Sequence, residues 1–199
     1  MINNFDREFL VMREREKGKR LLLHACCAPC SSYCLSETVD YFDVDVFFYN
    51  PNIDTEEEYK LRLEEEIRFV KEVYGDKVKV IDGGYNKEEF LNIARGKEDL
   101  KEGGARCYAC YALRLDKAAR YALDNNYDLF ATTLTVSPLK NARYLNEIGE
   151  SLSNKYGVKY LYSDFKKREG YKKSIELSSN HSLYRQNYCG CEFSKKKDN

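Results

Sequence analysis

Short apolar runs alternate with longer helix-forming segments along most of this chain, and this alternation restricts the fold more than any other feature. The runs are rich in leucine, β-branched and aromatic residues, which favour β-strands; they lie at 20–25, 44–49, 77–81, 128–135 and 158–162. The segments between and after them predict helices at 29–41, 55–74, 87–95, 107–124, 141–156 and 171–179. Because strands separated by helices of about 10 to 20 residues form βαβ units, we expect an α/β fold with a doubly wound, parallel sheet of about five strands.

The segment 55–74 is the best defined of the predicted helices. Thr55 and Glu58 form a capping box at its start, and Gly75 is suited to the C-terminal cap at its end. Four apolar residues recur at helical spacing and predict its buried face: Leu63, Ile67, Val70 and Tyr74.

The charge balance argues against a strongly basic nucleic-acid binder. Lysine and arginine together number 33, as do aspartate and glutamate, so the formal net charge is zero and only a local basic face remains for RNA. The chain has no run of about 18 apolar residues that could span a membrane, and its charged N-terminal segment lacks the apolar core of a secretory signal. We expect one cytoplasmic α/β domain over 1–199, with its core at about 20–193 and a disordered end at 194–199.

Eight cysteines fall into three clusters along the chain. The clusters are Cys26, Cys27, Cys30 and Cys34; Cys107 and Cys110; and Cys189 and Cys191. Because the cytoplasm keeps thiols reduced, cysteines in this number favour metal or redox chemistry over structural disulfides. Cys107 and Cys110 stand three positions apart at a predicted helix start, so both thiols can face one metal, and the helix dipole there favours their thiolate forms.

The unusual segments of the chain follow its predicted strands. “HACCAPCSS” follows the run at 20–25, “NPNID” the run at 44–49, “SPLKN” the run at 128–135 and “SDFKKREGY” the run at 158–162. The carboxyl ends of parallel strands meet at one edge of the sheet, where ligands bind, so we expect these segments to form a ligand site. The polar loop at 96–106, with its three glycines, could bring “RCYAC” to the same edge.

Three kinds of thiol site are compatible with the cysteine pattern alone. A structural zinc ion takes four ligands, and seven or eight thiols are offered here. An iron–sulfur cluster also takes cysteine thiolates, and a second metal beside it would use the remainder, with adjacent cysteines serving two neighbouring centres. A dithiol redox motif explains one pair and leaves the others without a role. Cys34, one turn after Cys30, is equally suited to a buried, apolar position.

Six motifs together resemble the cobalamin-independent epoxyqueuosine reductases of the QueH type, over about 22–193. The motifs are “HACCAPCSS”, “NPNI” followed by “EYKLR”, “RCYACYALRL”, “TTLTVSPLKN”, “DFKKREGY” and “LYRQNYCGC”. The resemblance implies a fold like the adenine-nucleotide α-hydrolase-like (HUP) domains, and reduction of the epoxide of epoxyqueuosine at the tRNA wobble position, the last step of queuosine biosynthesis. It also implies a [4Fe-4S] cluster with a mononuclear iron next to it, and a separate electron donor. “CCAPCSS” stands where ATP-using relatives of that fold carry a pyrophosphate loop, so no ATP use is expected.

Under this resemblance we hypothesise a division of the thiols between two metal centres. Cys26 or Cys27, with Cys107, Cys110 and Cys189, would hold the cluster. The other of the adjacent pair, with Cys191 and the further candidate Cys30, would hold the single iron.

Candidate catalytic residues flank these motifs. Asp164 ends the last predicted strand and is a candidate metal ligand or proton donor, or else a helix N-cap. Tyr108 is a candidate proton donor or base-stacking side chain, and His24, at a strand end beside the cysteines, is either functional or a packed, hydrogen-bonded histidine. The candidate tRNA-binding residues are Arg106, Arg114, Lys140, Asn141, Lys166, Lys167, Tyr184 and Arg185.

Two other functions compete with the reductase. A zinc-stabilised RNA-binding module without catalysis would be colourless and redox-inactive. A tRNA sulfur-transfer enzyme of the same fold would use a persulfide or a cluster-bound sulfur. It would need ATP to activate the base, and the missing pyrophosphate loop argues against it.

Overall fold

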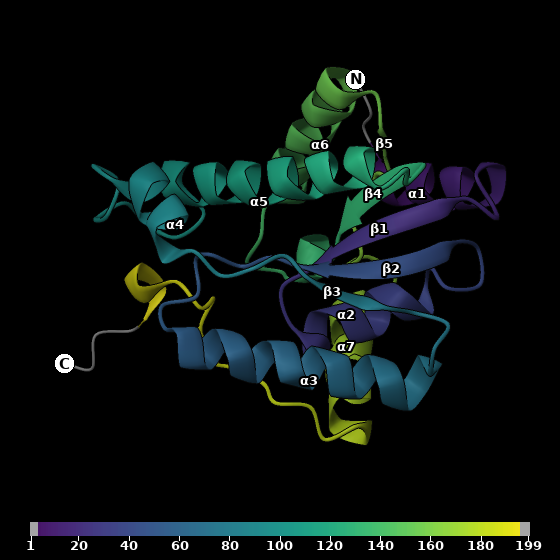
Figure 1. The fold of residues 1–199 in the computed structure, drawn as a ribbon, viewed down its shortest axis with the longest axis horizontal. Coiled ribbons are helices and arrows are strands. Elements are labelled where there is room, and N and C mark those ends of the chain that lie inside the picture. Colours follow the sequence, from purple (N-terminus) through teal and green to yellow (C-terminus); the bar gives the residue numbers. More distant parts are fainter. Residues whose placement is uncertain (1–3, 196–199) are drawn as a thin grey trace.

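The computed structural model describes residues 4–195 of the chain (Figure 1). Residues 196–199 of the end predicted to be disordered lie outside the described residues. Within 4–195, five strands form one parallel sheet: β1 (Arg20–Ala25), β2 (Asp43–Phe48), β3 (Val80–Asp82), β4 (Leu129–Thr132) and β5 (Lys159–Tyr160). Their order, β3-β2-β1-β4-β5, is that of doubly wound sheets, so the predicted α/β fold is confirmed. The domain limits of 1–199 stay a prediction.

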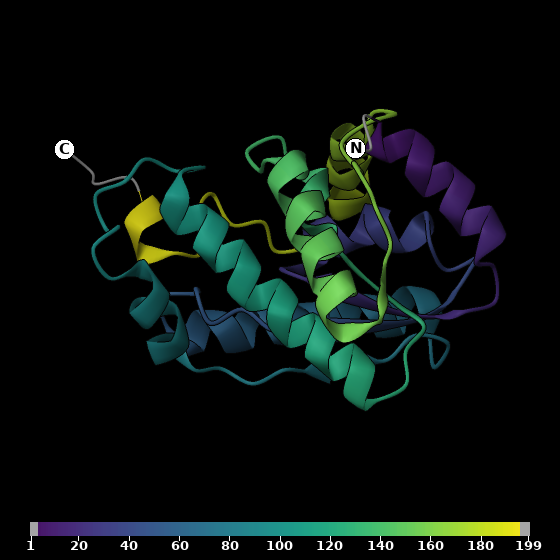
Figure 2. The same ribbon diagram turned by 90° about the horizontal axis from the view of Figure 1, so that it is seen from above.

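Helices cover both faces of the sheet, as Figures 1 and 2 show. One face carries α1 (Phe5–Arg15), α2 (Ala28–Ser36), α3 (Glu56–Tyr74) and α7 (Gly170–Asn180). The other carries α5 (Ala105–Asp124) and α6 (Ala142–Tyr156), with α4 (Lys87–Ala94) packed against α5. The short 3-10 helix η1 (Thr133–Val136) follows β4, and a second one, η2 (Glu192–Ser194), lies near the C-terminus. None of the helices in the described part of the chain is long and apolar enough to cross a membrane.

The central strand β1 is buried on both faces, which explains its uninterrupted apolar sequence. Leu21 and Leu23 pack into the core on the α2 and α3 side, whereas Leu22 packs into the core on the α5 and α6 side. Burial of each such leucine contributes roughly 1.5–3 kcal/mol, so β1 is held firmly between β2 and β4. The residues that follow Ala25 therefore emerge at the carboxyl edge, in the middle of the sheet.

Helix α1 was not predicted from the sequence. Most of its residues are charged or exposed, and only Phe9 and Met12 are buried. Asn4 caps its start, because its side chain accepts a hydrogen bond from the backbone nitrogen of Arg7 at 3.0 Å. The segment has only two buried apolar residues among its charged ones, which is too weak a periodic signal, and the helix is stabilised by tertiary packing instead.

Several predicted boundaries shift for local reasons. Helix α2 ends at Ser36 rather than 41, because the hydroxyl of Thr38 donates to the carbonyl of Cys34 at 2.9 Å and offers the backbone an alternative partner. Strand β4 ends at Thr132, whose side chain accepts from Leu134 and caps η1. Helix α5 begins at Ala105, two residues before its predicted start.

The predicted inner face of α3 is partly wrong. Ile67 is 47% exposed, whereas Arg62 and Glu66 are buried. Hydrophobic periodicity treats charged residues as solvent-facing, but here two of them face the interior of the protein, near the end of β1. Buried charges on an otherwise ordinary helix indicate a site.

Candidate functional site

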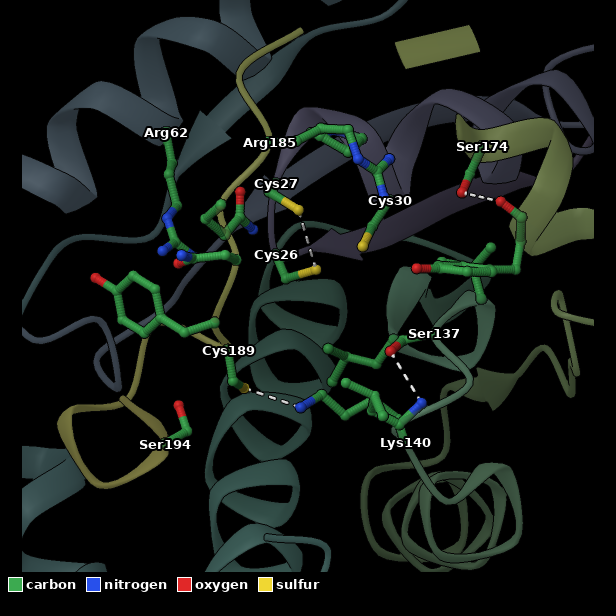
Figure 3. A pocket seen from close by; sticks show the side chains of 18 of the residues that line it. Cys26, Cys27, Cys30, Arg62, Ser137, Lys140, Ser174, Arg185, Cys189 and Ser194 are labelled. Carbon is green, nitrogen blue, oxygen red and sulfur yellow. Dashed lines mark hydrogen bonds between the residues drawn. The ribbon is translucent and has the colours of Figure 1, made fainter. Parts of the chain in front are cut away.

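A cavity of about 650 Å³ opens at the carboxyl edge of the sheet, beside the ends of β1 and β4 (Figure 3). Its wall comes from the turn between β1 and α2, the segment after β4, the start of α7 and the C-terminal segment. This is the point where the strand order reverses, which is where doubly wound sheets bind ligands. The volume lies in the roughly 300–1,000 Å³ range of small-molecule sites.

Three cysteines converge at this cavity and are called here the three-thiol group: Cys26, Cys27 and Cys30. All three sulfur atoms lie within 4.8 Å of one another, and Figure 3 shows them turned toward each other. Cys27 is the N-cap of α2 and Pro29 occupies its first turn, which begins the helix directly after β1. Hydrogen bonding to Cys26 raises the pKa of Cys27 to about 12 and the pKa of Cys30 well above its usual range, so these two stay thiols until a metal displaces their protons.

The sequence hypothesis assigned Cys26 and Cys27 to two different metal centres, and that division stays a prediction. The sulfur atoms of Cys26 and Cys27 lie 3.7 Å apart in one group. Tetrahedral thiolate sites with metal–sulfur bonds of about 2.3 Å place their sulfur atoms about 3.8 Å apart, so this spacing fits two ligands of the same metal.

A second cysteine group lies beside the first: Cys107, Cys110, Cys189 and Cys191. Cys107 and Cys110 come from the first turns of α5, as predicted, and Cys110 packs with Cys191. The backbone nitrogen of Gly103 donates to the sulfur of Cys107 at 3.2 Å. Burial raises the pKa of Cys110 to about 12 and that of Cys191 to about 11.

A glycine turn holds the C-terminal pair of cysteines in place. Gly190 has a φ of 98°, a left-handed conformation that residues with side chains rarely adopt. Its carbonyl accepts from the backbone nitrogen of Asp54 at 2.9 Å, which ties this turn to the segment after β2. A Cβ at Gly190 would lie 3.0 Å from Nη1 of Arg62, so the turn also packs closely against α3.

Arg114 lies between the two cysteine groups. Only 1% of it is exposed, and its charge acts on Cys26, Cys110 and Cys189. It donates to the side chain of Asn50, and no carboxylate pairs with it within residues 4–195. Hydrogen bonds from Cys27 and Cys30, together with the charge of Arg114, hold the pKa of Cys26 well below its usual range. The thiolate of Cys26 is thus a counter-charge of this buried cation.

Lys140 supplies a second cation at the thiols. Its ammonium nitrogen lies 2.9 Å from the sulfur of Cys189 and 3.2 Å from Oε1 of Glu102. Burial disfavours its charge, but the neighbouring Cys189 raises the pKa of Lys140 above its ordinary value.

The rest of the cavity wall is rich in cations. Glu102 is the one acidic residue among the described residues that line the cavity. The five basic residues in its wall are Arg62, Arg114, Lys140, Arg185 and Lys195. Such a wall attracts an anionic ligand, and phosphate groups are the anions that arginine and lysine bind best.

The structure brings three of the predicted tRNA-binding residues to the cavity: Arg114, Lys140 and Arg185. The others lie elsewhere. Arg106 is buried, and its guanidinium donates to the carbonyls of Lys97, Glu98 and Leu100, so it holds the predicted loop in place.

The four remaining candidates lie outside the cavity wall, and their roles in RNA binding stay predictions. Asn141 caps α6 by accepting from the backbone of Arg143 and Tyr144. Lys166 pairs with Asp164 at 2.9 Å, and Lys167 is exposed. The hydroxyl of Tyr184 lies 3.3 Å from the carboxylate of Glu58 in α3.

None of the three predicted catalytic residues lines the cavity, and their catalytic roles are likewise untested. His24 is fully buried, with its Nδ1 2.9 Å from the hydroxyl of Thr132 and its Nε2 3.1 Å from the carbonyl of Tyr49. Burial lowers the pKa of His24 to about 3, so the ring is neutral near pH 7. This is the state expected of a packed, hydrogen-bonded histidine. Tyr108 packs edge-on against Tyr144, with 41% of Tyr108 exposed.

Asp164 is not a helix N-cap. Helix α7 begins at Gly170, and the residue that precedes it is Glu169. Asp164 instead forms the ion pair with Lys166 described above.

Sequence reasoning missed several residues of the cavity wall: Arg62, Glu102, Tyr171, Gln186, Asn187 and Lys195. Arg62 lies in the “EYKLR” motif, one turn after Glu58, to which its Nε donates at 2.7 Å. The sequence feature that could have revealed Arg62 is its helical spacing, which places this charged residue on the buried face of α3. Tyr171 is the last residue of the “SDFKKREGY” segment, which was expected at the ligand edge, although the residue itself was not singled out. Lys195 carried no local signal, because only the tertiary fold brings it to the cavity.

The fold and the site together define a class: doubly wound α/β proteins with a thiol-lined ligand site at the carboxyl edge of the sheet. Comparison with known families specifies which member of the class this is. The sequence profile described as “Epoxyqueuosine reductase QueH” matches residues 21–197, and the chain belongs to this family.

Curated relatives match nearly the whole chain. The epoxyqueuosine reductase QueH of Staphylococcus epidermidis is 43% identical over 190 residues, which cover 93% of this chain and 79% of the relative. That of Streptococcus pyogenes is 40% identical over 200 residues, covering 97% and 78%. That of Thermotoga maritima is 36% identical over 177 residues, covering 87% and 89%. The family resemblance carried by the six motifs is therefore confirmed.

Proposed function

We propose that this chain reduces the epoxide of epoxyqueuosine, at the wobble position of tRNA, to the alkene of queuosine. The observation that carries the proposal is the gathering of seven cysteines from three distant segments, in a chain of the QueH family. Cys26, Cys27, Cys30 and Cys189 line the cavity. Cys107, Cys110 and Cys191 lie next to Cys189 behind its wall. Removal of the epoxide oxygen as water consumes two electrons and two protons. Each turnover therefore needs a separate electron donor, because the two electrons given to the epoxide have to be replaced.

The donor set fits an iron–sulfur cofactor with a neighbouring metal. Seven thiols exceed the four that one zinc ion takes, and the spacing within the three-thiol group suits metal ligation. We propose that the three-thiol group and the second cysteine group hold a [4Fe-4S] cluster and an adjacent iron between them. When bound, such a pair supplies one-electron transfer and Lewis-acid activation of the epoxide oxygen.

The protein's own side chains prepare the site in three ways. Arg114 and Lys140 offset the negative charge of buried thiolates, which would otherwise be costly to keep in a protein interior. Arg62 and Arg185 place cations where phosphates flanking the wobble nucleoside can reach them. Leu134 and other apolar residues of the wall limit the water around the epoxide. Asp164, Tyr108 and His24 stay candidates for proton transfer.

The experiment is anaerobic reconstitution followed by nucleoside analysis. Iron and sulfide are added to the purified chain, which is then given tRNA containing epoxyqueuosine and a chemical reductant. We expect a brown protein with more than about four irons per chain, bleaching with dithionite, and conversion of epoxyqueuosine to queuosine by mass spectrometry.

A matched pair of variants links the metal to the three-thiol group. Cys27→Ser removes a ligand and should lower both iron content and turnover. Cys34→Ser changes a fully buried cysteine that belongs to neither group and should retain both. A colourless protein that takes one zinc and leaves epoxyqueuosine intact would favour the RNA-binding module instead.

A further inference from the structure

The start of α7 has an unusual backbone. Arg168 and Glu169 are consecutive residues with φ of 51° and 61°, in the left-handed region that side chains disfavour. Gly170 follows, and a Cβ there would lie 1.8 Å from the carbonyl oxygen of Phe165 and 2.4 Å from a ring carbon of Tyr33. Conformations of this kind persist only where the surrounding structure enforces them, and they occur preferentially at functional sites.

Ion pairs outside the cavity enforce this conformation. The guanidinium of Arg168 donates to Asp6 at 3.0 Å and to Glu37 at 2.8 Å. Asp6 belongs to α1 and Glu37 follows α2, so two helices hold the start of α7 from behind. The residue that this arrangement fixes in the first turn of α7 is Tyr171, whose carbonyl accepts from the hydroxyl of Ser174 at 2.7 Å.

Tyr171 lines the cavity with an unoccupied ring. It is 39% exposed, and among residues 4–195 no aromatic ring, cation or hydrogen-bonding group engages its side chain. The other cavity tyrosine, Tyr188, differs. Its hydroxyl donates to Asp54 at 2.9 Å, and the charged groups of Arg62 and Lys195 lie 5.4 and 5.2 Å from its ring centre.

The cavity's size adds a requirement. A volume of about 650 Å³ takes a nucleoside but not a folded anticodon loop, so a base that presents its epoxide to the thiols must leave its stack. Unstacked bases in RNA complexes are held on aromatic faces. Leu139, which lines the same cavity and is 69% exposed, offers further apolar surface at the opening.

We infer that Tyr171 is the stacking platform for the base that carries the epoxide, held in position by the Arg168 ion pairs and Gly170. This inference rests on the proposed function. Because α1 and α2 fix the start of α7 before substrate arrives, the ring needs little further ordering when the base binds. Helix α1 thereby contributes to substrate binding without touching the substrate.

The test compares Tyr171→Ala and Tyr171→Phe in steady-state reduction of tRNA containing epoxyqueuosine. Tyr171→Ala should raise KM roughly five- to 150-fold, the range for stacking aromatics, and leave kcat nearly unchanged. Tyr171→Phe, which keeps the ring, should retain both constants. Arg168→Gln should raise KM in the same direction by a smaller factor. Ile175→Ala, on the same helix and 42% exposed but outside the cavity wall, is the matched control and should change neither.

Equilibrium binding of the same tRNA separates this inference from the proposed function. A higher Kd for Tyr171→Ala, together with a wild-type Kd for Tyr171→Phe, supports stacking. This holds even if the wild type fails to reduce epoxyqueuosine, because that failure would contradict the proposed function alone. An unchanged KM and Kd in Tyr171→Ala overturns the inference. A loss of kcat in Tyr171→Phe also overturns it, because the hydroxyl would then be the functional group.

Discussion

The ammonium nitrogen of Lys140 lies 2.9 Å from the sulfur of Cys189, and the two residues come from segments 49 positions apart. Lys140 lies between η1 and α6, and Cys189 lies in the C-terminal segment. A buried ammonium at this distance can offset the negative charge that the sulfur of Cys189 would carry as a metal ligand. The contact also ties the segment after β4 to the C-terminal segment at the cavity.

Replacement of Lys140 should slow the alkylation of Cys189 in the metal-free protein. In Lys140→Met the sulfur of Cys189 loses the ammonium that lies 2.9 Å away, so iodoacetamide labelling at pH 7 should fall severalfold. Lys140→Arg keeps a positive charge there and should label faster than the Met variant. Peptide mass spectrometry resolves Cys189 from the other cysteines. Lys172→Met, at an exposed lysine, is the control. Equal labelling of Cys189 in all four proteins would show that the cation has no effect on it.

Arg114→Met should reduce the iron that the chain retains after reconstitution. Buried thiolates in both cysteine groups lose their shared cation, and uncompensated charge in a protein interior is costly. Arg114→Lys keeps the charge but not the planar, multidentate guanidinium, so its iron content should lie between those of the wild type and Arg114→Met. The measurement is iron and sulfide per chain after desalting. Wild-type iron content in Arg114→Met would contradict this role.

The parts of the site that follow from local sequence were predictable. The run from Leu21 to Leu23 has to be a strand buried on both faces, and Pro29 fits the start of the helix after it, so the cysteines between them must emerge at the carboxyl edge. The pairing of Cys107 and Cys110 likewise depends only on helical spacing.

The parts that depend on distant contacts were not predictable. Arg62 faces inward because Glu58 pairs with it one turn away and because the cavity lies beside it. The spacing of apolar residues predicts neither the ion pair nor the cavity. Arg106 seemed a phosphate ligand from its position beside Cys107, but its guanidinium is used by three carbonyls of the preceding loop. The position of Tyr171 in the cavity wall depends on the distant contacts that Arg168 makes with Asp6 and Glu37.

The stability of the metal-free protein should fall as the pH rises from about 4.5 to about 8. Glu66 is fully buried, its Oε1 accepts from Ser31 at 2.5 Å, and its Oε2 has no partner within the described structure. Burial raises the pKa of Glu66 from 4.5 to about 8. Between these values the folded state binds the proton more tightly than the unfolded state. The free energy of unfolding therefore decreases, by at most about 1.4 kcal/mol per pH unit, and levels off above pH 8.

Urea unfolding at pH 5, 6.5 and 8 measures this effect. Glu66→Gln cannot ionise, so its pH dependence over this interval should be weaker than that of the wild type. Glu64→Gln, at an exposed position on the same helix, should keep the wild-type slope. Parallel curves for the wild type and Glu66→Gln would show that Glu66 does not titrate in this way.

Gly170→Ala should destabilise the protein more than Gly157→Ala. A Cβ at Gly170 would meet a backbone oxygen, that of Phe165, at 1.8 Å, and backbone cannot yield as a flexible side chain can. We expect a loss of about 3 kcal/mol or more, as for other changes that force atoms together in a packed interior. Gly157 has a φ of 75° and open space around it, so alanine there meets only backbone strain of about 1 kcal/mol. Urea unfolding of both variants compares the two losses directly. Equal losses would mean that the start of α7 can shift at little cost, and that the backbone before Tyr171 is not held as rigidly as its contacts indicate.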